Sequence, residues 1–161
     1  MEFEKVLLSR KSHRSFQDKQ VEAVKLEKIV TSGAMAPIGL VKMCTPMLTV
    51  VTDKEALAGL SGIYDAPALI IVSCPPSPAP GIADQNAACV VTTMALMATE
   101  LGLGSIYLYG VTANLQKDKE KQLSFGIPEN FTPLAALAVG YGTEEVSVCK
   151  EFVQKFNVTE V

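Results

Sequence analysis

Five consecutive residues near the N-terminus carry the clearest chemical signal in the sequence. Residues 10–14 read Arg-Lys-Ser-His-Arg, which combines three cations, a hydroxyl and an imidazole with no acid among them. The whole chain is acidic, with a formal net charge of -3. Guanidinium and ammonium groups bind phosphate and carboxylate through charge-assisted hydrogen bonds. This basic segment is therefore a candidate site for one small anion.

The basic segment also has a simpler explanation. Phe3, Val6 and Leu7 lie at helical spacing and the pattern ends at Ser9, so a short helix is expected just before the segment. Cations at the C-terminal end of a helix are favoured by the helix dipole. A solvated helix end thus stands beside the anion site as an alternative.

Residues that serve hydrolysis or metal binding are scarce. His13 is the single histidine, and the four cysteines form no CxxC pair. A zinc site needs a cluster of such ligands, and a Cys-His nucleophile would depend on His13 alone. We expect neither kind of site, and we interpret the cysteines as buried thiols: Cys44, Cys74, Cys89 and Cys149.

Several glycines invite comparison with a dinucleotide-binding fingerprint. That motif lies between a strand and the next helix, whose N-terminus holds the pyrophosphate. Here Gly102 and Gly104 follow an expected helix and precede a strand, which predicts a helix stop and a tight turn in place of a Rossmann site. Gly110 differs because it ends an expected buried strand, where backbone amides can face a ligand. Asp84 opens a long helix and is interpreted as a helix cap.

The hydrophobic pattern predicts alternating helices and strands. The expected helices cover residues 2–9, 24–36, 53–60, 83–101 and 113–125, and the expected strands cover 47–52, 68–73, 105–109 and 133–141. This order is typical of a layered α+β or α/β domain with a sheet of four or five strands. A chain of 161 residues fits one domain.

Two features of this pattern favour a homodimer. The helix expected at 83–101 is apolar nearly all round, so we expect it to pack on its own sheet on one side and on a partner subunit on the other. The tail after Gly142 ends with scattered apolar side chains, including Phe156 and Val158. One way to cover such a tail is to add it as a strand to a neighbouring sheet, including that of a partner.

Five segments, in order, resemble landmarks of the nitroreductase flavoprotein family. Residues 10–16 resemble its RxSxRxF opening, and Ala36-Pro37 resembles the loop after its second helix. The further landmarks are residues 95–105, 127–129 and 138–142. The resemblance implies one α+β domain over residues 1–161, built as a three-layer sandwich. Its mostly antiparallel or mixed sheet is flanked by helices in an intertwined homodimer, with the tail from about 143 to 161 exchanged.

The resemblance also implies a bound FMN and a set of residues around it. Arg10, Lys11 and Ser12 would hold its phosphate and ribityl chain, with Arg14 toward the pyrimidine edge of the flavin. The remaining cofactor contacts would come from the backbone of Leu108, Tyr109 and Gly110, from Pro37, Ile38 and Gly39 of the second subunit, and from Lys150 near the phosphate.

The function implied is that of an FMN-dependent oxidoreductase. It would pass electrons from NAD(P)H through FMN to a small acceptor such as a nitroaromatic or quinone. The cofactor carries such chemistry, so no catalytic side chain is required. Residues 38–46 depart from the family's polar loop, which leaves open a flavin-binding carrier, sensor or electron-transfer partner without NAD(P)H turnover. A dimeric scaffold whose basic segment is only a helix end is a third alternative.

Composition limits the partners and the location. The net negative charge argues against nucleic acid as the main partner, because phosphate backbones are held by an extended basic surface. No apolar window reaches the roughly 20 residues that a membrane-spanning helix needs. The first residues, MEFEKVLLSRK, lack the pattern of a secretory signal, so we expect a cytoplasmic protein.

Overall fold

The computed structural model describes residues 2–144 and 156–160. The elements are α1 (Phe3–Ser9), α2 (Ala23–Ala34), β1 (Met47–Val51), α3 (Lys54–Ala58), β2 (Ala68–Cys74), α4 (Ile82–Glu100), β3 (Gly104–Leu108), α5 (Gly110–Leu115), α6 (Lys119–Ser124) and β4 (Thr132–Gly140). Most expected helices and strands are present within a residue or two of their predicted ends.

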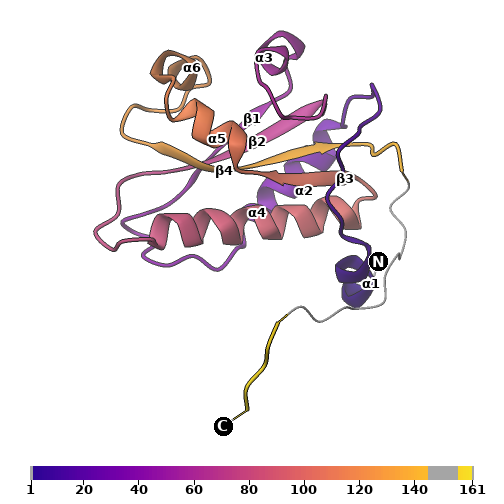
Figure 1. Ribbon diagram of the computed structural model, residues 1–161, viewed down its shortest axis with the longest axis horizontal. Coiled ribbons are helices and arrows are strands. Elements are labelled where there is room, and N and C mark those ends of the chain that lie inside the picture. Colours follow the sequence, from indigo (N-terminus) through magenta and orange to yellow (C-terminus); the bar gives the residue numbers. More distant parts are fainter. Residues whose placement is uncertain (1, 145–155, 161) are drawn as a thin grey trace.

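The strands form one antiparallel sheet in the order β1-β2-β4-β3. Helices α2 and α4 cover one face of this sheet, and α3, α5 and α6 cover the other (Figure 1). The expected three-layer α+β architecture is confirmed. In this strand order β3 is an edge strand, and its outer edge is therefore available to other parts of the chain.

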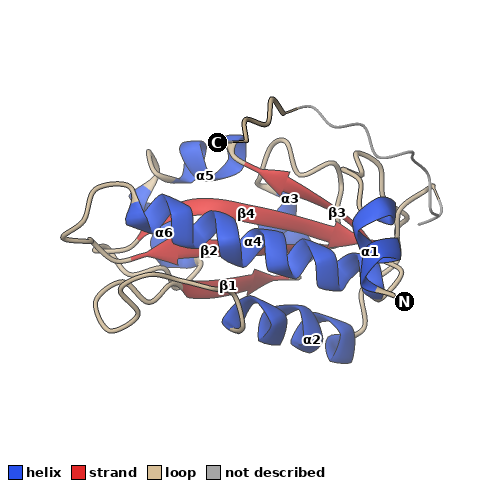
Figure 2. Ribbon diagram, turned by 90° about the horizontal axis from the view of Figure 1, so that it is seen from below, coloured by secondary structure: helices blue, strands red, loops and turns tan. Residues whose placement is uncertain are grey.

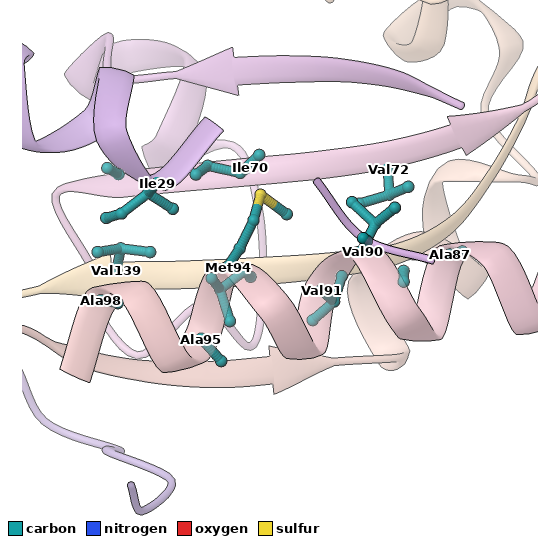
Figure 3. Packing of buried hydrophobic residues seen from close by; sticks show 14 of the residues in the cluster. Ile29, Ile70, Val72, Ala87, Val90, Val91, Met94, Ala95, Ala98 and Val139 are labelled. Atoms are coloured by element: carbon teal, nitrogen blue, oxygen red, sulfur yellow. The ribbon is translucent and has the colours of Figure 1, made fainter. Parts of the chain in front are cut away.

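Strand β2 shows how the sequence builds two cores at once. All seven of its residues are buried, as its continuous apolar run predicts. Ile70 and Val72 join the core beneath α2 and α4, whereas Leu69 and Ile71 join the core beneath the other helices. Figure 3 shows Met94 of α4 lying close to Ile70, within the first of these cores.

Helix α4 lies lengthwise across the sheet (Figure 2), and its sheet-facing apolar residues, such as Val90, Val91 and Met94, are buried. Other apolar residues of the helix are half-buried or exposed, so its expected burial is met only in part. Gly102 follows it with a φ of 73°, a left-handed conformation that ends the helix. One stripe of α4 points away from the sheet and stays exposed, namely Gln85, Ala88 and Thr92. This stripe carries uncharged side chains and leaves a face of α4 uncovered within one chain.

The expected helix at 113–125 was wrong, because two short helices occupy this region. Helix α5 begins already at Gly110, and Asp118 starts α6 by accepting a hydrogen bond from the N–H of Lys121 at 2.9 Å. Asp at this position competes with continued helix by capping a new one. The cysteines also differ in part from expectation: Cys44 and Cys74 are buried, but Cys89 is half-buried.

Several predictions for the C-terminal tail fall outside the described residues. Cys149 and Lys150 lie there, and so does most of the segment expected to be exchanged between subunits. Of the described tail residues, Phe156 is 82% exposed. Over the described parts of the chain, no helix is long and apolar enough to cross a membrane.

Candidate functional site at the edge strand

The basic segment leaves α1 and docks on the edge strand β3 (Figure 1). Arg10 ends α1, with its N–H donating to the carbonyl of Val6 at 2.9 Å. Ser12 then forms an isolated parallel bridge with Ser105, and the N–H of His13 donates to the carbonyl of Ser105 at 3.0 Å. Backbone pairing therefore holds the segment at a fixed place on β3. A solvated helix end would not need such pairing.

His13 fixes this contact through its side chain. It is 6% exposed and lies between two glycines. A Cβ on Gly104 would come within 2.7 Å of the His13 Cγ, and a Cβ on Gly142 within 2.6 Å of its Cδ2. Gly104 is thus the first residue of β3 and makes room for the imidazole; it does not form the tight turn that we expected. The sequence alone gave no sign that His13 and these glycines meet.

The charged groups of the segment face outward. Arg10, Ser12 and Arg14 are exposed, whereas Lys11 is half-buried. The Lys11 Nζ lies 2.5 Å from a carboxylate oxygen of Glu144, and this contact lowers the pKa of Glu144. One cation of the segment is therefore paired with a carboxylate of the same chain.

A cavity of about 230 Å³ opens beside these cations. Its lining residues are Ser12, His13, Arg14, Ser15, Thr143 and Glu144. Neither ring nitrogen of His13 has a hydrogen-bond partner within the described residues. Burial, followed by the charge of Lys11, lowers the pKa of His13, so the imidazole is neutral near pH 7. The cavity is thus lined by hydroxyls, a guanidinium, the carboxylate of Glu144 and a neutral imidazole.

The second expected group of cofactor contacts lies at the other end of β3. Leu108 ends the strand and is buried, Tyr109 is 70% exposed, and Gly110 opens α5. At the usual rise of a strand, Ser105 and Leu108 are separated by about 10 Å, and Gly110 lies two residues further along the chain. The structure therefore places the basic segment and the Tyr109-Gly110 backbone at opposite ends of one exposed edge. This arrangement suits an elongated ligand with an anionic group at one end.

The third expected group lies apart from the other two within one chain. Pro37 is exposed, and Gly39 is fixed to Asn86 in the second turn of α4 by a hydrogen bond of 2.8 Å. The basic segment instead lies beyond Glu100, at the far end of α4. Along the helix axis Asn86 and Glu100 are about 21 Å apart. Residues 37–39 of the same chain therefore do not reach the basic segment.

Asn86 was overlooked as a functional residue in the sequence. It is 2% exposed on a helix whose other buried residues are mostly apolar. A single amide among buried apolar side chains was the available signal, because such a group needs hydrogen-bond partners. Among the described residues, no group of three or more His, Cys, Asp or Glu could hold a metal ion.

Solved structures share this architecture. A nitroreductase with bound FMN from Bacteroides fragilis superposes with a TM-score of 0.82 at 27% identity, over 100% of this chain and 99% of that one. A nitroreductase family protein from Clostridium difficile gives 0.75 at 30% identity, over 91% and 88%. A curated relative from Archaeoglobus fulgidus, named "Putative NADH dehydrogenase/NAD(P)H nitroreductase", is 28% identical over 88% of this chain and 86% of its own.

The fold defines an α+β protein of the nitroreductase type. The model of the Nitroreductase family matches residues 42–141. The chain belongs to the nitroreductase family, and with it to a class of oxidoreductases. The basic segment lies before the matched range, so its assignment depends on the geometry described above.

Proposed function

We propose that this chain is an FMN-dependent oxidoreductase that takes electrons from NAD(P)H and passes them to a small acceptor such as a nitroaromatic or quinone. The observation that carries the proposal is the basic segment docked on β3, where Lys11 pairs with the carboxylate of Glu144. FMN has a phosphate at one end and a planar ring at the other, which matches the elongated edge between Ser12 and Gly110. The FMN bound in the Bacteroides fragilis relative supports the same assignment.

Each residue of the site has a definite task in this proposal. Arg10 and Lys11 neutralise the FMN phosphate, and the Ser12 hydroxyl hydrogen-bonds to the phosphate or the ribityl chain. When bound, FMN supplies the electron-transfer chemistry. The guanidinium of Arg14 places positive charge toward the pyrimidine edge, which favours negative charge there. The Leu108 to Gly110 backbone orients the ring near its reactive nitrogen.

The proposed pocket is completed by a second subunit. Residues 37–39 are remote from the basic segment within one chain, so Pro37, Ile38 and Gly39 of the partner subunit would approach the flavin. The N–H of Gly39 donates a hydrogen bond to the Oδ1 of Asn86. Gly39 therefore shapes this loop, and its N–H is not the group offered to the flavin. Lys150 near the phosphate, the exchanged tail and a cytoplasmic location stay predictions.

A comparison of two ligands tests the phosphate site. We expect the purified chain to bind FMN about tenfold or more tightly than riboflavin, because a charge-assisted contact to phosphate is absent for riboflavin. Flavin fluorescence quenching measures both affinities. Equal affinities, or no binding of either flavin, would contradict the proposed site.

A flavin-binding carrier or electron-transfer partner is the second candidate. It is favoured by the loop after Gly39, where Leu40, Val41 and Met43 are exposed in place of polar side chains. Such a loop offers apolar contact and few polar contacts to a flavin. Bound flavin that stays oxidised with both NADH and NADPH in the absence of oxygen would favour this candidate over the reductase.

A further inference from the structure

One buried amide holds the loop that the proposed pocket takes from each subunit. The Asn86 Oδ1 accepts a hydrogen bond from the N–H of Gly39 at 2.8 Å. The Asn86 Nδ2 donates to the carbonyl of Gly39 at 2.9 Å and to that of Cys44 at 3.4 Å. Both ends of the turn at residues 39–44 are therefore attached to a single side chain of α4.

The turn closes on itself through its backbone, and Cys44 at its end is buried in the core beneath α2 and α4, with its Sγ 3.9 Å from the carbonyl oxygen of Pro75. The N–H groups of Met43 and Cys44 both donate to the carbonyl of Leu40, at 2.8 and 2.9 Å, so they close the turn locally. Leu40 has a φ of 51°, in the left-handed region that a leucine rarely adopts. The backbone contacts fix the shape of the turn, whereas the two hydrogen bonds of Asn86 to Gly39 fix where the start of the turn sits on α4.

The approach of the loop to α4 is close. A Cβ on Gly39 would lie 2.8 Å from the Cδ1 of Ile82, one turn before Asn86. The backbone of Gly39 therefore reaches the helix without a side chain in between. This proximity allows both its N–H and its carbonyl to bond to the same amide.

An amide is the side chain that meets these demands. Asn provides an acceptor and two donors at once, whereas an ionised Asp provides acceptors alone and a Leu provides neither. Asn is not favoured in the interior of a helix, and its burial without partners would destabilise the fold. The presence of an Asn at residue 86 is thus explained by its hydrogen bonds to the loop and not by the needs of helix α4.

We propose that Asn86 is a positioning residue for the flavin site. It does not contact the flavin, but it holds Pro37, Ile38 and Gly39 in the place from which they complete the pocket of the partner subunit. This inference rests on the proposed function. Loss of the amide releases the loop and weakens flavin binding, although the basic segment on β3 is unchanged.

The test uses the full chain, FMN and two variants with a matched control. In Asn86→Leu the amide is replaced by an apolar side chain of similar size, and we expect the dissociation constant for FMN to rise about tenfold. Thr99→Val is the control, because the buried Thr99 donates to the carbonyl of Ala95 on the same helix, far from the loop. Its dissociation constant is expected to stay within twofold of wild type.

Asn86→Asp separates positioning from simple loss of stability. The ionised carboxylate accepts from Gly39 but cannot donate to the two carbonyls, whereas the protonated carboxyl has one donor again. We therefore expect its FMN affinity, relative to wild type at each pH, to recover as the pH falls. The visible absorption and circular dichroism of bound FMN should return toward the wild-type spectrum over the same range.

The outcomes separate this inference from the proposed function. A wild-type chain that binds no FMN overturns both. A wild-type chain that binds FMN, with Asn86→Leu equal to it in affinity and spectrum, overturns the positioning role alone. If Asn86→Leu does not fold, Asn86→Asp decides: a constant ratio of affinities across the pH range overturns the inference, and recovery at low pH supports it.

Discussion

His13 is the single histidine of the chain, and its burial makes it a clean reporter of the docked basic segment. Its pKa is lowered in the fold, mainly by burial and then by Lys11, from the ordinary value of 6.5. The unfolded chain therefore binds more protons at this residue than the folded chain does. Linkage then requires that stability falls as the pH drops below 6.5 and is fully present above it.

We expect this dependence to vanish in His13→Leu. Thermal melting of the chain without flavin, measured between pH 6.5 and 4.5, should show a fall in Tm for wild type. The lower limit is the ordinary pKa of the glutamates, some of which also have a lowered pKa. The variant should show a flatter profile in this window. Equal slopes would mean that His13 is not buried as a neutral group.

Arg10 provides a direct test of the anion site. Arg10→Ala removes a charge-assisted contact, so we expect FMN affinity to fall about tenfold and riboflavin affinity to change little. Lys5→Ala is the control, because Lys5 is an exposed cation of α1 that pairs with Glu2. Equal losses for both variants in a fluorescence titration would indicate a general effect of charge and would reject the assigned contact.

A substitution of Glu144 is expected to change FMN binding in the opposite direction. Its carboxylate forms an ion pair with the ammonium of Lys11, to which the FMN phosphate is proposed to bind. Glu144→Gln removes this competitor, so FMN should bind about threefold more tightly, as befits an exposed ion pair. Isothermal titration at low and at moderate salt measures the change. Weaker binding would show that Glu144 orients Lys11 for the cofactor.

At the scale of the elements, the packing of the basic segment against β3 depends on Gly104 and Gly142, which both lie against His13. Gly104→Ala places a methyl group against His13, so we expect the free energy of unfolding to fall by about 1–3 kcal/mol. The loss should shrink in a His13→Ala background, because the clash is removed. Gly110→Ala, where a Cβ meets open space, is the control in urea denaturation without flavin. Additive effects of the two substitutions would contradict the contact.

Local sequence patterns predicted most of these elements. The apolar run of β2 predicted its burial, and the apolar pattern of α4 predicted a helix that packs on the sheet. Asp53 caps α3 by accepting a hydrogen bond from the N–H of Ala56. The break between α5 and α6 was missed, although Asp118 is a residue type that favours a helix N-cap and starts α6. The sequence gives no local sign of contacts between distant residues, such as His13 with Gly142.

The candidate site was predictable only in part, because local patterns reveal residue types and spacing but not contacts between distant residues. The cations of residues 10–14 are visible as types and spacing, but their docking on Ser105 depends on the order of strands in the sheet. The three hydrogen bonds of Asn86 join residues more than 40 positions apart. Such contacts follow from the packed fold and leave no periodic pattern.

At the scale of the whole molecule, the exposed stripe of α4 is the surface that we expect a second subunit to cover. Ala88→Arg places a charge in this stripe, so sedimentation should show a shift from dimer to monomer, together with weaker FMN binding. Ala58→Arg on α3, in the opposite layer, is the control and should stay dimeric. A wild-type monomer that binds FMN would contradict the shared pocket.

Electron transfer is the central claim, and it is tested by one measurement on the FMN-loaded wild-type chain. NADH and NADPH are added in turn without oxygen, and the visible flavin absorption is followed. We predict that at least one of them bleaches the flavin, and that a nitroaromatic or quinone then restores the oxidised spectrum. Bound flavin that stays oxidised with both nicotinamides would contradict an NAD(P)H-dependent reductase.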